Sequence, residues 1–216
     1  NNPDRPSKRL WTENNAGTHL KHYTAIDEHA EANFIIETMQ KEHMEKHRPY
    51  GDMAVLYRMN AQSRVIEEAL VRRGIGYTMV GGTRFYDRAE IRDMLAYLKV
   101  INNFKDNISL ARIINTPKRG IGGTTVEKLL DYANAGGMSM FEGIMGIEGS
   151  GLSSATQRKL TNFSAMIFDF LNASTEMNVF ELIQKVMTDT KYLAQLQESK
   201  DPQAQSREEN LGELLS

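Results

Sequence analysis

The stretch Gly81-Gly-Thr-Arg-Phe-Tyr-Asp-Arg-Ala-Glu-Ile-Arg-Asp-Met-Leu-Ala-Tyr-Leu98 divides the chain into two parts with different patterns. Before it, short apolar runs alternate with longer amphipathic segments. After it, apolar residues recur with helical spacing. Paired glycines reach backbone angles that other residues avoid, so we predict a domain boundary and a hinge at Gly81-Gly82. Phe85 and Tyr86 either stack on bases or pack the linker against a core.

The N-terminal part predicts a small parallel sheet. Met53-Ala-Val-Leu-Tyr57 is almost wholly apolar, as in a strand buried on both faces. Further strands are expected at 20–26 and 77–80, with helices at about 27–47 and 60–74 between them. The order β-α-β-α-β predicts parallel strands covered by helices. Three strands are few for an α/β domain, so we expect the remaining strands outside this chain.

The C-terminal part predicts helices and no strand. Glycine, proline, asparagine and serine residues separate the helical stretches. The expected ranges are 88–103, 108–115, 123–136, 139–145, 153–174, 178–187, 189–198 and 203–215. The fold class that we expect is therefore α/β plus all-α, a partial parallel sheet followed by a helical part.

Composition excludes several classes of protein. The chain of 216 residues has no cysteine, which rules out disulfides and thiolate metal sites and fits a reducing cytosol. Its net charge of −2 argues against a strongly basic coat for nucleic acid, although local basic patches remain compatible with it. No apolar run approaches the roughly 18 residues that a membrane span needs. The five histidines lack a zinc-site arrangement, so we expect no metal site. The sequence has no nucleophile elbow, no P-loop and no paired acidic metal motif, so we expect no catalytic set.

A glycine turn after two basic residues is the first candidate site, in Asn115-Thr-Pro-Lys-Arg-Gly-Ile-Gly-Gly-Thr-Thr-Val-Glu-Lys-Leu129. Lys118 and Arg119 precede Gly120-Ile121-Gly122, and Thr125 lies in the first turn of the helix expected next. Unpaired backbone N–H groups beside positive side chains suit a phosphate oxygen. The spacing matches neither a dinucleotide-binding loop nor a P-loop, which favours a nucleic-acid backbone. The alternative is a plain turn between packed helices.

A second candidate site follows the strand expected at 53–57. Arg58 and Asn60 come directly after that strand, at the edge of a parallel sheet where ligands usually bind. Their side chains can hydrogen-bond phosphates or bases. The alternative is structural: Arg58 pairs with Glu67 or Glu68, and Asn60 only caps the following helix.

Three stretches together resemble the UvrD/Rep/PcrA group of superfamily 1 DNA helicases, most closely its bacterial PcrA type. They are Leu56-Tyr-Arg-Met-Asn-Ala-Gln-Ser-Arg64, Gly81-Gly-Thr-Arg-Phe-Tyr-Asp-Arg-Ala-Glu-Ile-Arg-Asp93 and Asn115-Thr-Pro-Lys-Arg-Gly-Ile-Gly122, in matching order and spacing. Lys8-Arg-Leu-Trp-Thr12 and Gln205-Ser-Arg-Glu-Glu-Asn-Leu211 extend the resemblance to both ends. The likeness therefore covers essentially the whole chain.

The resemblance implies a piece of a helicase in which two RecA-like domains hydrolyse ATP and move 3′ to 5′ along single-stranded DNA, in repair or replication. Residues 1–80 then correspond to part of the second RecA-like domain, called 2A, and 81–216 to most of its helical insertion, called 2B. Gly81-Gly82 corresponds to the hinge of that insertion. The implied DNA contacts are Arg58 and Asn60 with single strands, and Gly120, Ile121 and Gly122, with Thr125 nearby, with duplex DNA.

The ATP site of that group is missing from these residues. Its P-loop, acidic Mg²⁺ motif and arginine fingers are absent, and phosphoryl transfer depends on them. We therefore expect no cofactor in this chain, ATP and Mg²⁺ in a longer parent protein, no ATP hydrolysis by the chain alone, and a location in the bacterial cytoplasm. The alternative function is a helical protein-docking or DNA-binding module of a helicase-nuclease or repair scaffold, with protein partners unidentified.

Overall fold

The computed structural model describes residues 11–13, 15–198 and 202–215. These residues form α-helices and short 3₁₀ helices, which alternate with irregular connections. The α-helices are α1 (Glu28–Lys46), α2 (Ser63–Arg72), α3 (Ala89–Asn102), α4 (Asn107–Ile113), α5 (Gly123–Ala135), α6 (Met140–Met145), α7 (Ser154–Ser174), α8 (Val179–Asp189), α9 (Tyr192–Gln197) and α10 (Ala204–Leu214). The 3₁₀ helices are η1 (Tyr50–Asp52), η2 (Asn60–Gln62), η3 (Phe85–Asp87) and η4 (Ile147–Ser150).

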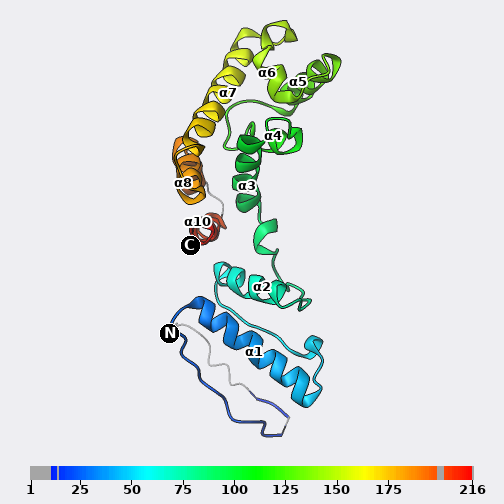
Figure 1. Ribbon diagram of the computed structural model, residues 1–216, viewed down its shortest axis with the longest axis vertical. Coiled ribbons are helices and arrows are strands. Elements are labelled where there is room, and N and C mark those ends of the chain that lie inside the picture. The colour runs from blue at the N-terminus through cyan, green and yellow to red at the C-terminus, as the bar shows by residue number, and fades with distance from the viewer. Residues whose placement is uncertain (1–10, 14, 199–201, 216) are drawn as a thin grey trace.

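The molecule is elongated, with α1 and α2 at one end and α5 and α6 at the other (Figure 1). The chain passes from α2 into α3 and α4, reaches α5 and α6 at the far end, and returns along the long helix α7. Helices α8, α9 and α10 bring it back, so that α10 contacts both α3 and η2. No helix in the described part of the chain is long and apolar enough to cross a membrane.

The expected partial parallel sheet, and with it the α/β class, is wrong, because none of the described residues lies in a β-strand. A strand needs backbone hydrogen bonds to a neighbouring strand. No such bond joins 20–26, 53–57 and 77–80 within the described part of the chain. One face of these segments is open, since Leu56 is 94% and Val80 93% exposed, whereas Val55 and Tyr77 are half-buried. The apolar runs predicted strands buried on both faces, but the described residues provide no layer that covers the open face.

The helices expected after Gly81 are confirmed, each within about three residues of its expected range. Local capping explains this agreement, because a side-chain oxygen that accepts an N–H of the first turn defines where a helix begins. Ser139 accepts a hydrogen bond from the backbone N–H of Glu142 at 3.2 Å, and Asn178 accepts one from Glu181 at 3.0 Å. The helix expected at 27–47 is also confirmed as α1.

Two separate clusters of buried apolar side chains hold the molecule together. The smaller cluster lies between α1 and α2 and consists of Ala32, Ile36, Val65, Ala69, Leu70 and Ile75. The larger cluster runs from Phe85 to Leu211 and joins α3 to all later helices. The clusters divide between Ile75 and Phe85, the interval that contains both glycines of Gly81-Gly82.

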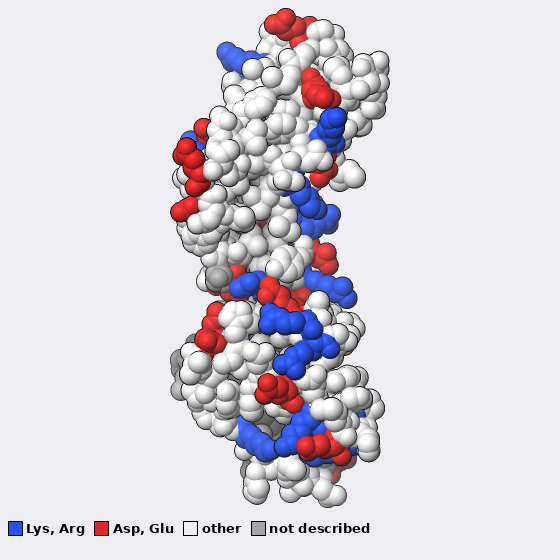
Figure 2. All heavy atoms as spheres, in the orientation of Figure 1, with Lys and Arg blue, Asp and Glu red and all other residues white. Residues whose placement is uncertain are grey.

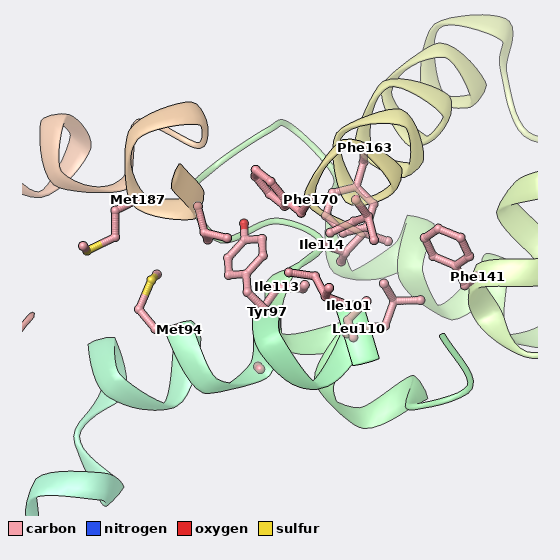
Figure 3. Close-up of a cluster of buried hydrophobic side chains, with 14 of the residues drawn as sticks. Met94, Tyr97, Ile101, Leu110, Ile113, Ile114, Phe141, Phe163, Phe170 and Met187 are labelled. Atoms are coloured by element: carbon pink, nitrogen blue, oxygen red, sulfur yellow. The ribbon is translucent and has the colours of Figure 1, made fainter. Parts of the chain in front are cut away.

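Helix α3 lies at the centre of the larger cluster (Figure 3). Tyr97 of α3 is fully buried, and its ring meets that of Phe170 on α7 edge-on, with 6.3 Å between centroids. Leu110 of α4 and Phe163 of α7 pack into the same cluster. Burying each large apolar side chain contributes ~1.5–3 kcal/mol. Phe85 is 1% exposed here, so it packs the linker against a core, which was one of its two expected roles.

Candidate nucleic-acid interface

The glycine turn expected to bind an anion connects α4 to α5. Gly120 has φ +71°, in the left-handed region that favours glycine. Gly122 is extended, with φ −79° and ψ 167°, and it precedes α5 without any side chain capping that helix. The first backbone N–H groups of a helix have no partner within the helix. A Cβ atom built on Gly122 or Gly123 would meet nothing within 4 Å, so the backbone is open to an approaching ligand there.

Side chains from the connection itself, from α7 and from α9 hold the turn in place. The Asn115 side-chain oxygen accepts hydrogen bonds from the backbone N–H groups of Arg119 at 2.8 Å and Ile121 at 3.1 Å. Lys159 of α7 donates from Nζ to the Gly120 carbonyl oxygen at 2.9 Å. The Lys118 backbone N–H donates to the Gln195 side chain of α9 at 3.1 Å. The turn is therefore held at several points of its backbone rather than left as a loose loop.

The Arg119 guanidinium points into the protein rather than toward solvent. It donates hydrogen bonds to the carbonyl oxygens of Ile113 at 2.9 Å and Pro117 at 3.1 Å, and to the Tyr97 hydroxyl. It also lies 5.4 Å from the centroid of the Phe163 ring. Arg119 thus supports the turn from the core side, and its guanidinium already contacts oxygens and an aromatic ring of the protein.

Tyr97 completes this support beneath the turn. Its hydroxyl donates to the Thr116 carbonyl oxygen while it accepts from Arg119. Burial raises the pKa of Tyr97 to about 12, although the neighbouring Arg119 guanidinium acts in the opposite direction. The hydroxyl therefore keeps its proton, and its hydrogen bond to the turn, at neutral pH.

The other residues expected at this site differ in what they expose. Ile121 is 1% exposed and belongs to the larger apolar cluster, so only its backbone is available to a ligand. Lys118 is exposed and Thr125 is half-buried in the first turn of α5. Lys159 is exposed beside Gly120 and is the residue that sequence reasoning missed. It lies 39 positions from Gly120, so no local pattern could have indicated it.

The second candidate site lies beside the N-terminal cluster. Arg58 is exposed, and among the described residues no ion pair involves it. The expected structural alternative is not observed, because Glu67 accepts bonds from Ser63 and Tyr77, and Glu68 pairs with Arg64.

Asn60 begins η2 and is exposed, while its carbonyl oxygen accepts a hydrogen bond from Arg88 at 2.9 Å. The backbone N–H groups of Arg58 and Met59 both donate to the Gln62 side chain, at 3.2 and 3.1 Å. The backbone at this site is thus fixed, whereas the Arg58 side chain projects into solvent.

The structure does not bring the two candidate sites together. Arg58 directly precedes η2 and α2 in the N-terminal part, whereas the glycine turn connects α4 to α5, which lie beyond α3 (Figure 1). The 14 residues of α3 alone span roughly 20 Å. Each site would therefore contact its own segment of a ligand.

Charge is mixed over the face shown in Figure 2, where Lys and Arg side chains alternate with Asp and Glu. A broad basic face, such as proteins that coat nucleic acid carry, is not seen on this side. On this face, contact with nucleic acid would thus depend on a few local groups rather than on a large electrostatic surface.

The resemblance places ATP and Mg²⁺ in a longer parent protein rather than in this chain. Within residues 11–13, 15–198 and 202–215, no group of three or more His, Cys, Asp or Glu side chains could hold a metal ion.

Known proteins are similar to this chain along its whole length. The family model described as UvrD-like helicase C-terminal domain matches residues 1–216. The chain is 42% identical over 216 residues to the ATP-dependent DNA helicase PcrA of Bacillus subtilis (strain 168). It is 44% identical over 216 residues to the protein of the same name from Leuconostoc citreum. In both cases the whole chain is covered, and it spans 29% of the length of the relative.

Proposed function

The chain belongs to the family of UvrD-like helicase C-terminal domains, and from this premise we propose that it is the DNA-contacting piece of an ATP-dependent helicase. In this proposal the parent protein moves 3′ to 5′ along single-stranded DNA in the bacterial cytoplasm, during repair or replication. The relatives that share at least 41% of its residues are ATP-dependent DNA helicases by name. The chain itself contributes contacts to DNA rather than the groups that catalyse ATP hydrolysis.

Residues 1–80 are assigned to domain 2A and residues 81–216 to its helical insertion 2B. The support is the division of the buried apolar side chains, which fall into one cluster ending at Ile75 and another beginning at Phe85. Each part has its own core, as separate folding units require.

Duplex DNA is the proposed ligand of the glycine turn. The observation that carries this assignment is the open backbone at Gly122 and Gly123, next to an uncapped helix start. A phosphate oxygen there can accept backbone N–H groups, and the exposed lysines Lys118 and Lys159 supply positive charge nearby. Such contacts carry no sequence information, which suits a motor that works on any DNA.

Single-stranded DNA is the proposed ligand of Arg58 and Asn60. The Arg58 side chain is exposed and without an ion pair in the described structure, while its backbone is fixed by Gln62. A guanidinium held in this way can bind a phosphate through two parallel hydrogen bonds. The separation of this site from the glycine turn lets one chain engage a single strand and a duplex together.

ATP hydrolysis belongs to the parent protein in this proposal. The sequence carries no P-loop, acidic Mg²⁺ motif or arginine finger of this family, and phosphoryl transfer depends on such groups. The purified chain should therefore hydrolyse no ATP with or without DNA. Hydrolysis by the purified chain above a buffer control would contradict the assignment.

The Gly122→Ala variant tests the duplex assignment. Gly122 has an ordinary backbone conformation and open space around it, so alanine fits the fold. The added methyl would obstruct a phosphate that approaches the backbone, and we expect roughly tenfold weaker duplex binding. Single-strand binding should stay unchanged. Gly212→Ala is the matched control, since Gly212 is also exposed and has nothing within 4 Å of its Cβ position.

Two results would contradict the duplex assignment. One is unchanged duplex binding by Gly122→Ala, and the other is an equal loss of duplex and single-strand binding. A salt series separates DNA contact from protein docking, because backbone binding weakens steeply as salt rises. A chain that binds no DNA at low salt would favour the docking module instead.

A further inference from the structure

The side chain of Asn115 bridges the glycine turn across Gly120. Asn115 follows α4 and is half-buried. Its side-chain oxygen accepts the backbone N–H of Arg119 at 2.8 Å, just before Gly120, and that of Ile121 at 3.1 Å, just after it. An amide oxygen has two lone pairs, so these two bonds use its full capacity. One side chain thus closes the turn into a ring.

The bridge decides which backbone N–H groups of the turn remain open to a ligand. Those of Arg119 and Ile121 are already bonded to Asn115. The N–H groups at 122–124, where α5 begins, have no acceptor among the described residues. Three successive donors are therefore left for a phosphate oxygen, in the arrangement that suits an anion at a helix start.

Gly120 is the residue whose freedom the bridge restricts. Its φ of +71° lies in the left-handed region, and glycine loses more conformational freedom on ordering than any other residue. The bonds of Asn115 fix the backbone immediately before and after Gly120, so they set the direction in which the chain enters α5. Ile114 and Ile121 are buried in the larger apolar cluster, which anchors both ends of the bridge.

The other side chains that hold the turn do not replace this bridge. Arg119 donates to two backbone carbonyl oxygens and Gln195 accepts one backbone N–H, all of them before Gly120. Lys159 bonds to the carbonyl oxygen of Gly120 itself. Of these side chains, Asn115 alone bonds to the backbone after Gly120.

We propose that Asn115 is a positioning residue, which holds the three N–H donors at 122–124 in place for a phosphate of duplex DNA and does not itself touch DNA. This role rests on the proposed duplex contact of the glycine turn. A site that is ordered before binding avoids the loss of conformational freedom on binding, so its affinity is higher. Asn115 carries no charge, so the salt dependence of binding should not depend on it.

Hydrogen exchange in the whole protein that carries this chain tests whether the turn is ordered in advance. Without DNA, the N–H groups of Arg119 and Ile121 should exchange slowly and those at 122–124 fast. Duplex DNA should slow exchange at 122–124 by about tenfold or more. Fast exchange at Arg119 and Ile121 that slows only with DNA would mean that DNA orders the turn, and would overturn the positioning role.

Two substitutions of Asn115 separate positioning from direct contact. Asn115→Ala removes the oxygen and should weaken duplex binding roughly tenfold, with an unchanged salt slope and unchanged single-strand binding. Asn115→Asp keeps an acceptor oxygen, so at about 0.3 M salt, which screens much of its added charge, it should bind duplex more tightly than Asn115→Ala. A side chain that touched DNA through its NH₂ group would give the reverse order.

Asn178→Ala is the matched control for these substitutions. Asn178 also accepts a backbone N–H, from Glu181 at 3.0 Å, but it caps α8 instead of the glycine turn. Its loss should leave duplex binding unchanged. Equal weakening by Asn178→Ala and Asn115→Ala would point to general destabilisation and overturn the positioning role.

Two further results would overturn the role of Asn115. One is unchanged duplex binding by Asn115→Ala, and the other is binding by Asn115→Asp that is no tighter than that of Asn115→Ala. If Asn115→Ala loses helical circular dichroism, Asn115→Leu, of similar size but without an acceptor, decides by the same criteria.

The Gly122→Ala variant separates this role from the proposed function. If Gly122→Ala weakens duplex binding and Asn115→Ala does not, the duplex contact stands and the positioning role fails. If Gly122→Ala leaves duplex binding unchanged, the duplex contact itself fails, and the positioning role fails with it.

Discussion

Lys159 and Gly120 are joined by a hydrogen bond of 2.9 Å, from the lysine Nζ to the glycine carbonyl oxygen, across 39 positions of the chain. The bond holds an exposed positive charge beside the glycine turn, where a DNA phosphate is proposed to bind. It also ties α7 to the connection between α4 and α5. The lysine can therefore act in two ways, by charge and by support of the turn.

Replacing Lys159 with methionine separates these two roles. If the charge contacts DNA, Lys159→Met should weaken duplex binding and reduce the slope of log affinity against log salt by about 1. Binding measured over a series of salt concentrations gives this slope. An unchanged slope together with weaker binding would mean that the lysine only supports the turn.

Removing the Arg58 side chain should weaken the binding of single-stranded DNA alone. Arg58→Ala takes away an exposed guanidinium that has no ion pair in the described structure, so stability should change by less than about 0.5 kcal/mol. We expect single-strand affinity to fall roughly tenfold and duplex affinity to stay the same. Arg72→Ala is the control, because Arg72 is also an exposed arginine but lies at the end of α2. Equal effects of the two variants would argue against a specific contact.

The Ile121 side chain should contribute to the stability of the protein rather than to DNA binding. Its side chain is 1% exposed, so Ile121→Ala leaves a cavity and should lower the free energy of unfolding by about 2–5 kcal/mol. Ile121→Val should cost only about 0.5–1.5 kcal/mol and leave duplex affinity unchanged. Urea unfolding and duplex titration of both variants check this. A loss of affinity in folded Ile121→Val would show that the side chain does reach DNA.

Alkaline pH should destabilise the protein through Tyr97. Burial raises its pKa to about 12 in the folded state, compared with about 10 in the unfolded chain. The folded state holds this proton more tightly, so the stabilisation is complete below pH ~10 and is lost as pH rises toward ~12. Burial and Asp93 also raise the pKa of Tyr192, which adds to the effect. Tyr97→Phe should flatten the decline in urea unfolding free energy, and an equally steep decline would contradict the assignment.

The helical part could be predicted because its signals are local. Ser139 and Asn178 accept N–H bonds within three residues of themselves, and these short-range contacts set the helix starts. In the N-terminal part the helix at 27–47 could be predicted, but the expected strands could not. The apolar run 53–57 indicates only that the segment suits burial between neighbours, and a strand also requires backbone partners from elsewhere. Among the described residues those partners are absent, and Leu56 remains exposed.

The glycine turn before α5 could be predicted from the sequence, whereas its role as a binding site stays a prediction. The spacing of the residues could not tell which side chains of the turn face the core. Arg119 and Ile121 lie inside because Tyr97 and the apolar cluster lie beneath the turn, contacts that depend on packing of distant helices. The bond from Lys159 to Gly120 also depends on such a long-range contact.

Helix α10 contacts both α3 and η2, so the chain returns to the place where it entered the helical part. A segment whose two ends lie side by side behaves as a cassette, since both ends are attached at one place. Helices α3 to α10 therefore form one unit around the larger apolar cluster, joined to the N-terminal part at that single place.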